Sequence, residues 1–223
     1  NPNNSKALSF LPICHIFERM ILYLYQYYGV SVYFGESIDK ISENIKEVQP
    51  TVMSVVPRLL EKVYDKIYAK GNELTGIKKK LFFWAINLGL RYEPYGANGF
   101  WYELQLKIAR KLIFSKWKEG LGGNLDLMAS GSAALQPRLT RVFAAAEIPV
   151  MEGYGLTETS PVISVNDMRN KGFKIGTVGK LINGVEVKIA EDSEILCKDT
   201  NVKIGYYKDE KKTKEALANG YFH

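Results

Sequence analysis

The sequence has few of the residues from which metal cages and disulfide frameworks are built. Two cysteines and two histidines occur among its 223 residues. Cys14 and Cys197 are far apart in the chain, and no C-x-x-C pair is present. Zinc sites and disulfide-rich secreted domains need closely spaced cysteines or histidines, so both classes are disfavoured. The scarcity of cysteine is consistent with a reducing compartment, and we expect the protein to be cytoplasmic.

Several common signatures are also missing. The sequence contains no G-x-x-x-x-G-K-[ST] loop, no G-x-G-x-x-G turn and no G-x-S-x-G elbow. P-loop NTPases, dinucleotide-binding oxidoreductases and serine hydrolases therefore lose support. A transmembrane helix needs about 18 or more apolar residues in a row, and the apolar run 20–25 is interrupted by Gln26 and Gly29.

The net charge of +6 comes from one segment of the chain. Residues 70–119 contain ten Lys or Arg and four Asp or Glu, whereas the rest of the chain contains 20 of each sign. Such a segment could face anionic lipid, an anionic cofactor or RNA. Apolar residues interrupt the basic ones, which favours a solvated face on two helices. We expect no nucleic-acid partner and retain peripheral membrane contact through this segment as an alternative.

Strand-like and helix-like segments alternate at the start of the chain. Apolar runs at residues 7–11, 30–34 and 51–56 predict buried strands, and the segments between them have helical periodicity. Ser37 suits the cap of one helix and Pro57 the first turn of the next. The alternation predicts an α/β fold in which helices cover a parallel sheet.

Residues 71–120 interrupt the alternation. Helical periodicity appears at residues 77–88 and again at 100–112, with a loop containing proline and glycine between them. These residues therefore predict a helical insertion. Strands are expected again at residues 124–130 and 148–151, with a helix between them.

Towards the C-terminal end the pattern becomes β-rich. Short runs at residues 175–181, 185–190 and 194–198 are separated by turn residues, which predicts a small antiparallel sheet or open barrel. We expect two partial domains, an α/β core at residues 1–168 and a β-barrel subdomain at residues 169–223.

The most informative stretch is the Gly-Tyr-Gly-Leu-Thr-Glu-Thr sequence that begins at Gly153. Gly153 and Gly155 allow the backbone to approach a ligand closely. Tyr154 offers a flat face to a planar ring. Thr157 offers a hydroxyl to phosphate oxygens, and Glu158 offers a hard oxygen ligand to Mg2+. Together these residues predict a nucleotide site.

Two other segments could face the same cleft. Ser130–Leu135 is a loop of small residues after a predicted strand, and ligands of parallel sheets bind outside the carboxyl ends of the strands. Taken alone, this loop is more typical of a tight strand-to-helix turn. His15 also follows a predicted strand and could line the cleft, pack inside or cap a helix. Glu18 and Arg19 are expected to form a local ion pair of little energetic weight.

Segments in order along the whole chain resemble the acyl-activating, adenylate-forming family of AMP-binding enzymes. The heptapeptide that starts at Gly153 matches the family's most diagnostic motif residue for residue. The other similar segments are Leu11–Arg19, Ser130–Leu135, Gly205–Tyr207 and Gly220–His223. Within the family, the chain is most similar to long-chain fatty acyl-CoA synthetases, through the His-x-Phe-Glu-Arg form at His15, the run Val56–Tyr64 and the insertion.

This resemblance implies an ATP-dependent acid–thiol ligase with ATP, Mg2+ and coenzyme A. A fatty carboxylate would attack the α-phosphate of ATP to form an acyl-adenylate, and the coenzyme A thiol would then take the acyl group. A ligase for another carboxylic acid, a non-catalytic nucleotide-binding module and a structural module remain the alternatives.

The resemblance also implies residue roles. Glu158 would bind Mg2+ and Thr157 would contact phosphate, as the residues that act in catalysis together with His15 beside the acyl and pantetheine passage. The residues expected to lie around the nucleotide are Gly131, Ser132, Ala133, Gly153, Tyr154, Gly155 and Thr157.

Several family elements do not occur in the 223 residues. They are the phosphate loop with its lysine, the Thr-Gly-Asp that follows Gly-Trp-Phe-His, and the C-terminal domain with its catalytic lysine. Ser132 and Ala134 also depart from the family's adenine segment. We therefore expect a central fragment of a longer enzyme, inactive when isolated, whose exposed strand edges could pair two copies into a homodimer.

Overall fold

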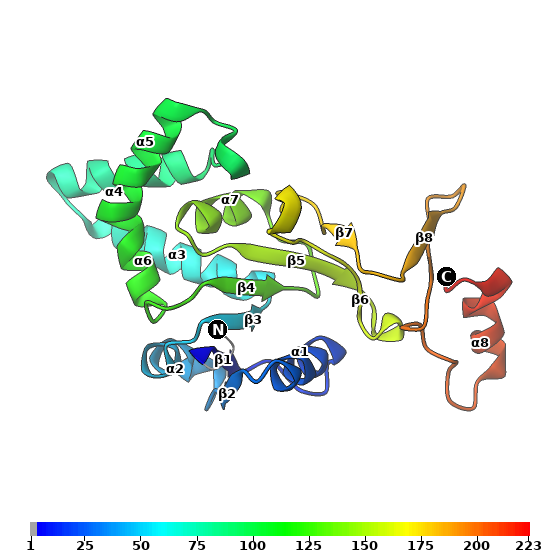
Figure 1. The fold of residues 1–223 in the computed structure, drawn as a ribbon. Helices are drawn as coiled ribbons and strands as arrows, with labels where there is room; N and C mark the ends of the chain where they lie inside the picture. Colours follow the sequence, from blue (N-terminus) through cyan, green and yellow to red (C-terminus); the bar gives the residue numbers. More distant parts are fainter. Residues whose placement is uncertain (1–3) are drawn as a thin grey trace.

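In the computed structural model, which describes residues 4–223, a seven-stranded sheet runs through the molecule (Figure 1). Its strand order is β2-β1-β3-β4-β5-β6-β7. The pairs from β2 to β5 are parallel, and the pairs β5–β6 and β6–β7 are antiparallel. The expected α/β class with a parallel sheet is confirmed. The strands are β1 (Lys6–Ser9), β2 (Ser31–Phe34), β3 (Val52–Val55), β4 (Leu127–Ser130), β5 (Val150–Gly155), β6 (Val162–Val165) and β7 (Lys180–Leu181).

Helices cover both faces of the parallel part. Ala7 and Leu8 are neighbours on β1 and are both fully buried, because successive side chains point to opposite faces. Ala7 packs against α1, whereas Leu8 belongs to the larger core under the other helices. The helices are α1 (Ile16–Tyr27), α2 (Ile41–Val48), α3 (Pro57–Glu73), α4 (Gly76–Gly89), α5 (Phe100–Ala109), α6 (Ser115–Gly120), α7 (Pro137–Ala145) and α8 (Glu210–Ala216).

Of the two helix starts that the sequence predicts from single residues, the one at Pro57 is correct and the one at Ser37 is wrong. Pro57 begins α3, as predicted, because its fixed φ suits a first helical turn. Ser37 does not cap α2: its side chain makes no capping hydrogen bond, and a 3-10 turn at Ile38–Lys40 comes first. The position of α2 is therefore decided by burial of Ile41 and Ile45 rather than by a side-chain cap at Ser37.

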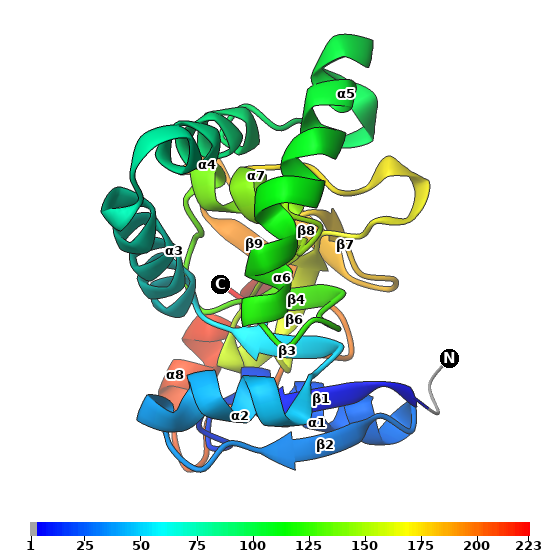
Figure 2. The ribbon, with the colours of Figure 1, turned by 90° about the vertical axis from the view of Figure 1, so that its left-hand side faces the viewer.

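The insertion is helical, as expected, and consists of α4, α5, a π-turn at Arg110–Phe114 and α6. Its inner surface is held by aromatic rings. Phe114 lies 5.3 Å from Trp117, and Trp117 lies 6.1 Å from Phe143 of α7, both between ring centroids with edge-on geometry. Figure 2 shows α5 projecting away from the sheet at the top of the molecule.

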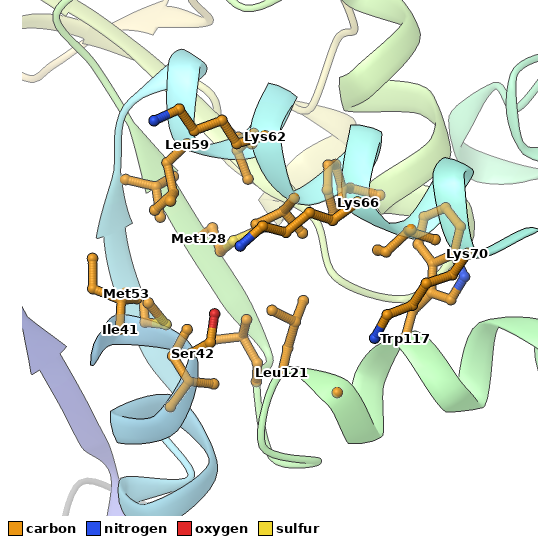
Figure 3. Close-up of a pocket in the computed structure, with 18 of the residues that line it drawn as sticks. Ile41, Ser42, Met53, Leu59, Lys62, Lys66, Lys70, Trp117, Leu121 and Met128 are labelled. Carbon is orange, nitrogen blue, oxygen red and sulfur yellow. The ribbon is translucent and has the colours of Figure 1, made fainter. Parts of the chain in front are cut away.

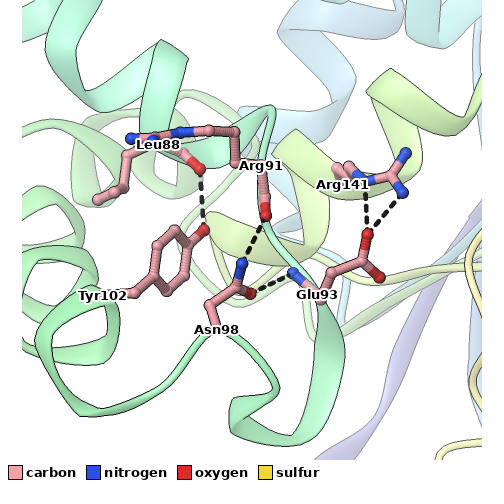
Figure 4. A network of polar contacts seen from close by, with 6 residues as sticks. All are labelled: Leu88, Arg91, Glu93, Asn98, Tyr102 and Arg141. Atoms are coloured by element: carbon pink, nitrogen blue, oxygen red, sulfur yellow. Dashed lines mark hydrogen bonds and ion pairs between the residues drawn. The ribbon is translucent and has the colours of Figure 1, made fainter.

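Polar contacts close the loop between α4 and α5 (Figure 4). Tyr102 donates its hydroxyl to the Leu88 carbonyl at 2.8 Å, and the Asn98 amide donates to the Arg91 carbonyl at 3.0 Å. Burial raises the pKa of Tyr102 to about 12, and the nearby Glu103 carboxylate adds to the rise. The insertion is joined to α7 by an ion pair of 2.6 Å between Arg141 and Glu93.

The C-terminal part differs in detail from the expectation. Of the run 175–181 only Lys180–Leu181 is a strand, and it extends the large sheet. A separate antiparallel pair follows, β8 (Glu186–Ile189) with β9 (Ile195–Lys198), which confirms the small antiparallel sheet that was one of the two expectations for this end of the chain. The barrel subdomain stays a prediction. The boundary at residue 168 stays a prediction.

Strand β2 forms one edge of the sheet and is largely exposed, with Phe34 64% exposed. An open edge can pair with a second chain. Homodimer formation stays a prediction, which sedimentation of the chain at several concentrations would check.

Candidate active site

Loops that leave the carboxyl ends of β1, β4 and β5 meet around a cavity of about 290 Å3. These three strands lie close together in the sheet, and β4 and β5 are direct neighbours. The structure thus brings together residues that are up to 147 positions apart in the chain, from His15 to Val162. The lining residues are His15, Ile16, Phe17, Gly131, Ser132, Gly153, Tyr154, Gly155, Leu156, Thr157, Glu158, Pro161 and Val162.

One predicted site residue is not part of this lining. Ala133 is exposed and lies outside the cavity, although its neighbour Ser132 lines it. Ser132 has a positive φ of 71°, and the exposed Ala133 and Ala134 that follow it do not line the cavity.

His15 lies at the mouth of the cavity. It is exposed, and its backbone forms the cap position of α1 without a side-chain capping hydrogen bond. The packed alternative for this histidine is therefore wrong, whereas His15 does occupy the cap position of α1, through its backbone alone. The imidazole is free to meet a ligand that enters the cavity.

The loop that bears the diagnostic motif folds back on itself. A Cβ on Gly155 would lie 1.6 Å from the Pro161 carbonyl oxygen, so only glycine fits this position. The Leu156 N–H donates to that oxygen at 3.0 Å, and the buried Thr159 hydroxyl donates to it at 2.6 Å. This closure presents Thr157 and Glu158 at the cavity.

A buried carboxylate joins this strand to the second loop. Glu152 accepts hydrogen bonds from the Leu135 N–H at 3.3 Å and the Thr140 hydroxyl at 3.0 Å. Burial raises the pKa of Glu152, and both hydrogen bonds oppose that rise. Sequence reasoning missed this residue, although an acid within an otherwise apolar strand was a visible signal.

Glu18 anchors the first segment, and here the sequence-based expectation is wrong. Its carboxylate is fully buried and accepts hydrogen bonds of 2.5 Å from the hydroxyls of Ser9 and Ser54. Arg19, the next residue, is exposed. Among the ion pairs of the described residues there is none between Glu18 and Arg19. Glu18 thus fixes the first turn of α1 against β1 and β3, because it reaches serines on both strands.

Glu158 is the one carboxylate in the lining of the cavity. Its Oε1 accepts a hydrogen bond of 3.0 Å from the Tyr206 hydroxyl. Residues 4–223 contain no cluster of three or more His, Cys, Asp or Glu that could form an all-protein metal cage. Mg2+ commonly binds through one or two carboxylates together with substrate phosphates, so the single carboxylate of this cavity fits that ion if a phosphate-bearing ligand binds beside it.

A second, larger cavity of about 1110 Å3 lies beside the first, on the face of the sheet covered by α2, α3 and α6. We call it the apolar groove. Met53 and Met128 lie at its base, and Lys62, Lys66 and Lys70 extend over it from α3 (Figure 3). Phe10, Leu11 and Pro12 line the groove and His15, Ile16 and Phe17 line the smaller cavity, so one short segment separates the two spaces.

Known proteins with similar sequences are acyl-CoA ligases. The chain is 32% identical to the long-chain-fatty-acid–CoA ligase FadD15 of Mycobacterium bovis over 97% of its own length and 36% of the relative's. It is 35% identical to long chain acyl-CoA synthetase 3 of Arabidopsis thaliana over 97% of this chain and 34% of that protein. The chain thus spans about a third of the length of these curated relatives.

Solved structures share the fold at lower sequence identity. A fatty acyl CoA synthetase of Mycobacterium tuberculosis superimposes with a TM-score of 0.65 at 18% identity, over 98% of this chain and 36% of the other. The o-succinylbenzoate CoA synthetase of Bacillus subtilis, solved in complex with its acyl-adenylate intermediate, gives a TM-score of 0.62 at 18% identity. This match covers 98% of this chain and 37% of the other.

The family model for AMP-binding enzymes matches residues 1–207, which include every loop of the candidate site. Because the match extends over most of the chain, and the motif loops it contains meet at one cavity, the chain belongs to the AMP-binding enzyme family.

Proposed function

We propose that the protein takes part in the ATP-dependent activation of long-chain fatty acids. In the first step a carboxylate oxygen of the acid bonds to the α-phosphorus of ATP, and pyrophosphate leaves with the electrons of the broken P–O bond. In the second step the sulfur of coenzyme A bonds to the acyl carbon and its proton passes to solvent, while the bond from that carbon to the phosphate oxygen breaks and AMP leaves with the bonding electrons. ATP, coenzyme A and the fatty acid are the substrates of this proposal.

The observation that carries the proposal is the composition of the smaller cavity. Gly131 and Gly153 bring backbone to the lining of the cavity, and the Tyr154 ring offers a face against which a planar base can stack. Thr157 presents a hydroxyl that can donate to phosphate oxygens. Ring face, hydroxyl and carboxylate lie along one short stretch of chain, which matches the order of base and phosphates in a nucleotide.

Glu158 would hold Mg2+ together with the nucleotide phosphates. The ion would neutralise negative charge on the phosphates. The chain's own contribution is to orient the nucleotide and to place the acid beside it, because positioning accounts for much of the rate of such transfers. His15, at the cavity mouth, is suited to contact the acyl group or the thiol as it approaches.

The apolar groove supports a long-chain acid over a small one. Its volume of about 1110 Å3 is lined mainly by aliphatic side chains of the sheet and of α2 and α3, and burial of each CH2 contributes about 0.8 kcal/mol. An acid whose chain lay in the groove would need to pass the segment Phe10–Phe17 to reach the smaller cavity. A short or aryl acid would leave most of this groove unfilled.

Adenylation by the protein expressed from its complete coding sequence tests the proposal. We expect palmitate-dependent ATP–pyrophosphate exchange, and we expect Glu158→Ala to reduce it at least about a hundredfold because the charge stabiliser is lost. The variant Glu191→Ala, at an exposed residue in the loop between β8 and β9, is the control. Near wild-type exchange by Glu158→Ala at limiting Mg2+ would contradict the metal role, and the absence of exchange with any acid would contradict the function.

The 223-residue chain alone gives a second measurement. We expect it to bind ATP weakly in calorimetric titration and to show no exchange above a protein-free blank. Exchange by this chain would overturn the expectation that it is inactive when isolated.

The projecting helix α5 supports the proposal that the protein contacts an anionic membrane surface. Phe100 and Trp101 are 74% and 73% exposed at its start, and the basic Lys107 and Lys111 follow. Exposed aromatic residues beside lysines are typical of helices that lie in the interface of a bilayer. No helix formed by residues 4–223 has the length and apolar character needed to cross a bilayer.

Vesicle flotation tests this contact. The protein should float with vesicles that contain phosphatidylglycerol and not with phosphatidylcholine alone, and Phe100→Ser with Trp101→Ser should abolish flotation. Tyr27→Ser is the control, because Tyr27 is 82% exposed on a different helix. Equal flotation of the double variant would refute the role of α5.

A further inference from the structure

The segment that contains Lys203 and Tyr206 contacts Glu158 at two places. The Tyr206 hydroxyl donates to Glu158 Oε1 at 3.0 Å, and the Lys203 backbone N–H donates to the Glu158 carbonyl oxygen at 2.8 Å. Side chain and backbone of the same glutamate are thus held by one segment that is more than 40 residues away in the sequence.

Tyr206 is itself anchored to α8. Its backbone N–H donates to the Thr213 hydroxyl at 2.8 Å, and that hydroxyl donates to the Asp209 carbonyl at 2.8 Å. Asp209 in turn caps α8, because its Oδ1 accepts from the Lys212 N–H at 3.0 Å. A continuous series of hydrogen bonds therefore connects the start of α8 to Glu158.

The Tyr206 ring has packing contacts that do not depend on its hydroxyl. The Lys203 ammonium lies over the face of this ring and also 5.1 Å from the centroid of the Phe222 ring. The ammonium is buried and has no hydrogen-bond partner among residues 4–223, so the rings provide its immediate surroundings. Removal of the hydroxyl alone would leave these contacts in place.

The hydrogen bond engages only one oxygen of the carboxylate. Oε1 is occupied by Tyr206, whereas Oε2 accepts no hydrogen bond from the described residues and belongs to a side chain that lines the smaller cavity. A carboxylate that is held at one oxygen loses little further freedom when the other oxygen binds a cation. Hydrogen-bond partners of this kind orient metal-binding carboxylates in other proteins.

We propose that Tyr206 is a positioning residue for Glu158: its hydroxyl holds the carboxylate so that Oε2 faces the Mg2+ that accompanies the bound nucleotide. The inference rests on the proposed function, because it requires Glu158 to bind that ion. It extends the candidate site to the C-terminal segment and to α8.

Tyr206→Phe tests the inference, with Tyr207→Phe as the matched control. Tyr207 is 88% exposed. Each variant removes one tyrosine hydroxyl, and the two tyrosines are neighbours in the sequence.

In the protein expressed from its complete coding sequence, the affinity for Mn2+·ATP is measured by water proton relaxation and the affinity for metal-free ATP by calorimetry in EDTA. We expect Tyr206→Phe to weaken Mn2+·ATP binding about three- to tenfold, below the usual range for such partners because Tyr206 is partly exposed, and to leave metal-free ATP binding unchanged. Tyr207→Phe should match the wild type in both.

The outcomes separate the inference from the proposed function. If the wild type binds no Mn2+·ATP, the proposed function fails and this inference fails with it. If the wild type binds and Tyr206→Phe binds equally well or more tightly, only the role of Tyr206 is overturned. If Tyr206→Phe weakens metal-free ATP binding to the same extent, the hydroxyl supports the shape of the cavity rather than the metal ligand, and the inference is again overturned.

Discussion

The candidate site and the helical insertion are stabilised in opposite ways. The site loops are rich in small residues. They are held by a hydrogen bond that Glu152 accepts and by hydrogen bonds that Thr159 and Tyr206 donate. The insertion is held by large apolar side chains such as Phe114 and Trp117, which are 1% and 5% exposed.

This difference has a physical reason. A site that binds a nucleotide must offer backbone and polar atoms to the ligand, so its shape depends on turns and on hydrogen-bonded anchors. A helical layer has only to cover the sheet, so its stability depends on packed volume. Changes of volume should therefore reduce the stability of the insertion, whereas changes of backbone or anchor should affect the site.

The largest effect is expected in the insertion. Phe114→Ala should lower the free energy of unfolding by about 3–5 kcal/mol, because it leaves a cavity beside Trp117. Urea unfolding would measure the loss, with the milder Phe114→Leu as a second variant should the first not fold. Leu112→Ala, at a side chain that is 44% exposed, should cost about 1 kcal/mol or less. A loss of ATP affinity in folded Phe114→Leu would contradict the separation of the two regions.

An intermediate effect is expected in the motif. Gly155→Ala should cost about 2–3 kcal/mol and weaken ATP binding, because the new methyl group would overlap the Pro161 carbonyl and open the turn. Gly153→Ala is the matched control for stability alone, since its Cβ would meet nothing closer than the Ser164 oxygen at 3.4 Å. Urea unfolding would compare the two variants, and calorimetric titration would measure ATP binding by Gly155→Ala. Equal losses of stability in the two variants would show that the close approach at Gly155 does not govern the turn.

The smallest effect is expected from a single buried hydroxyl of the insertion. Tyr102→Phe should cost about 1 kcal/mol at neutral pH, because the Leu88 carbonyl loses its donor. The pKa of Tyr102 is raised from 10.0 to about 12, so the folded chain keeps a proton that the unfolded chain releases. Wild-type stability from this group is present below pH 10 and is lost as the pH rises from 10 to about 12.

Urea unfolding at intervals between pH 9 and pH 12 would measure this window. Tyr102→Phe should lose less stability across it than the wild type does, and its ATP affinity at neutral pH should be unchanged. An identical pH dependence in the two proteins would contradict a buried, un-ionised Tyr102.

Much of the fold follows from patterns along the chain. The runs at residues 51–56 and 124–130 contain β3 and β4, and the periodicity at residues 77–88 lies within α4. Two elements were not predicted. Helix α8 has charged residues all round and no apolar stripe, and β6 is a short strand directly behind the motif.

In the candidate site, too, some parts were predictable from the sequence and others were not. The motif at Gly153 and the loop at Gly131 were recognisable, because close backbone approach requires glycine in the local sequence. The carboxylates that anchor the loops were not recognisable. Glu18 was expected to form an ion pair with Arg19, but its carboxylate accepts hydrogen bonds from serines of β1 and β3. Glu152 and Tyr206 went unnoticed as parts of the site because their partners are remote in sequence.

By itself, the sequence determined the α/β class, the helical insertion and the family, because strand runs, helical periodicity and motif residues are all encoded within short stretches of chain. Only the tertiary structure decided which loops meet at the cavity, that Ala133 lies outside it, and which donors Glu18, Glu152 and Glu158 find. The reason is that a buried or oriented carboxylate is defined by its partners, and these come from segments that only folding brings together.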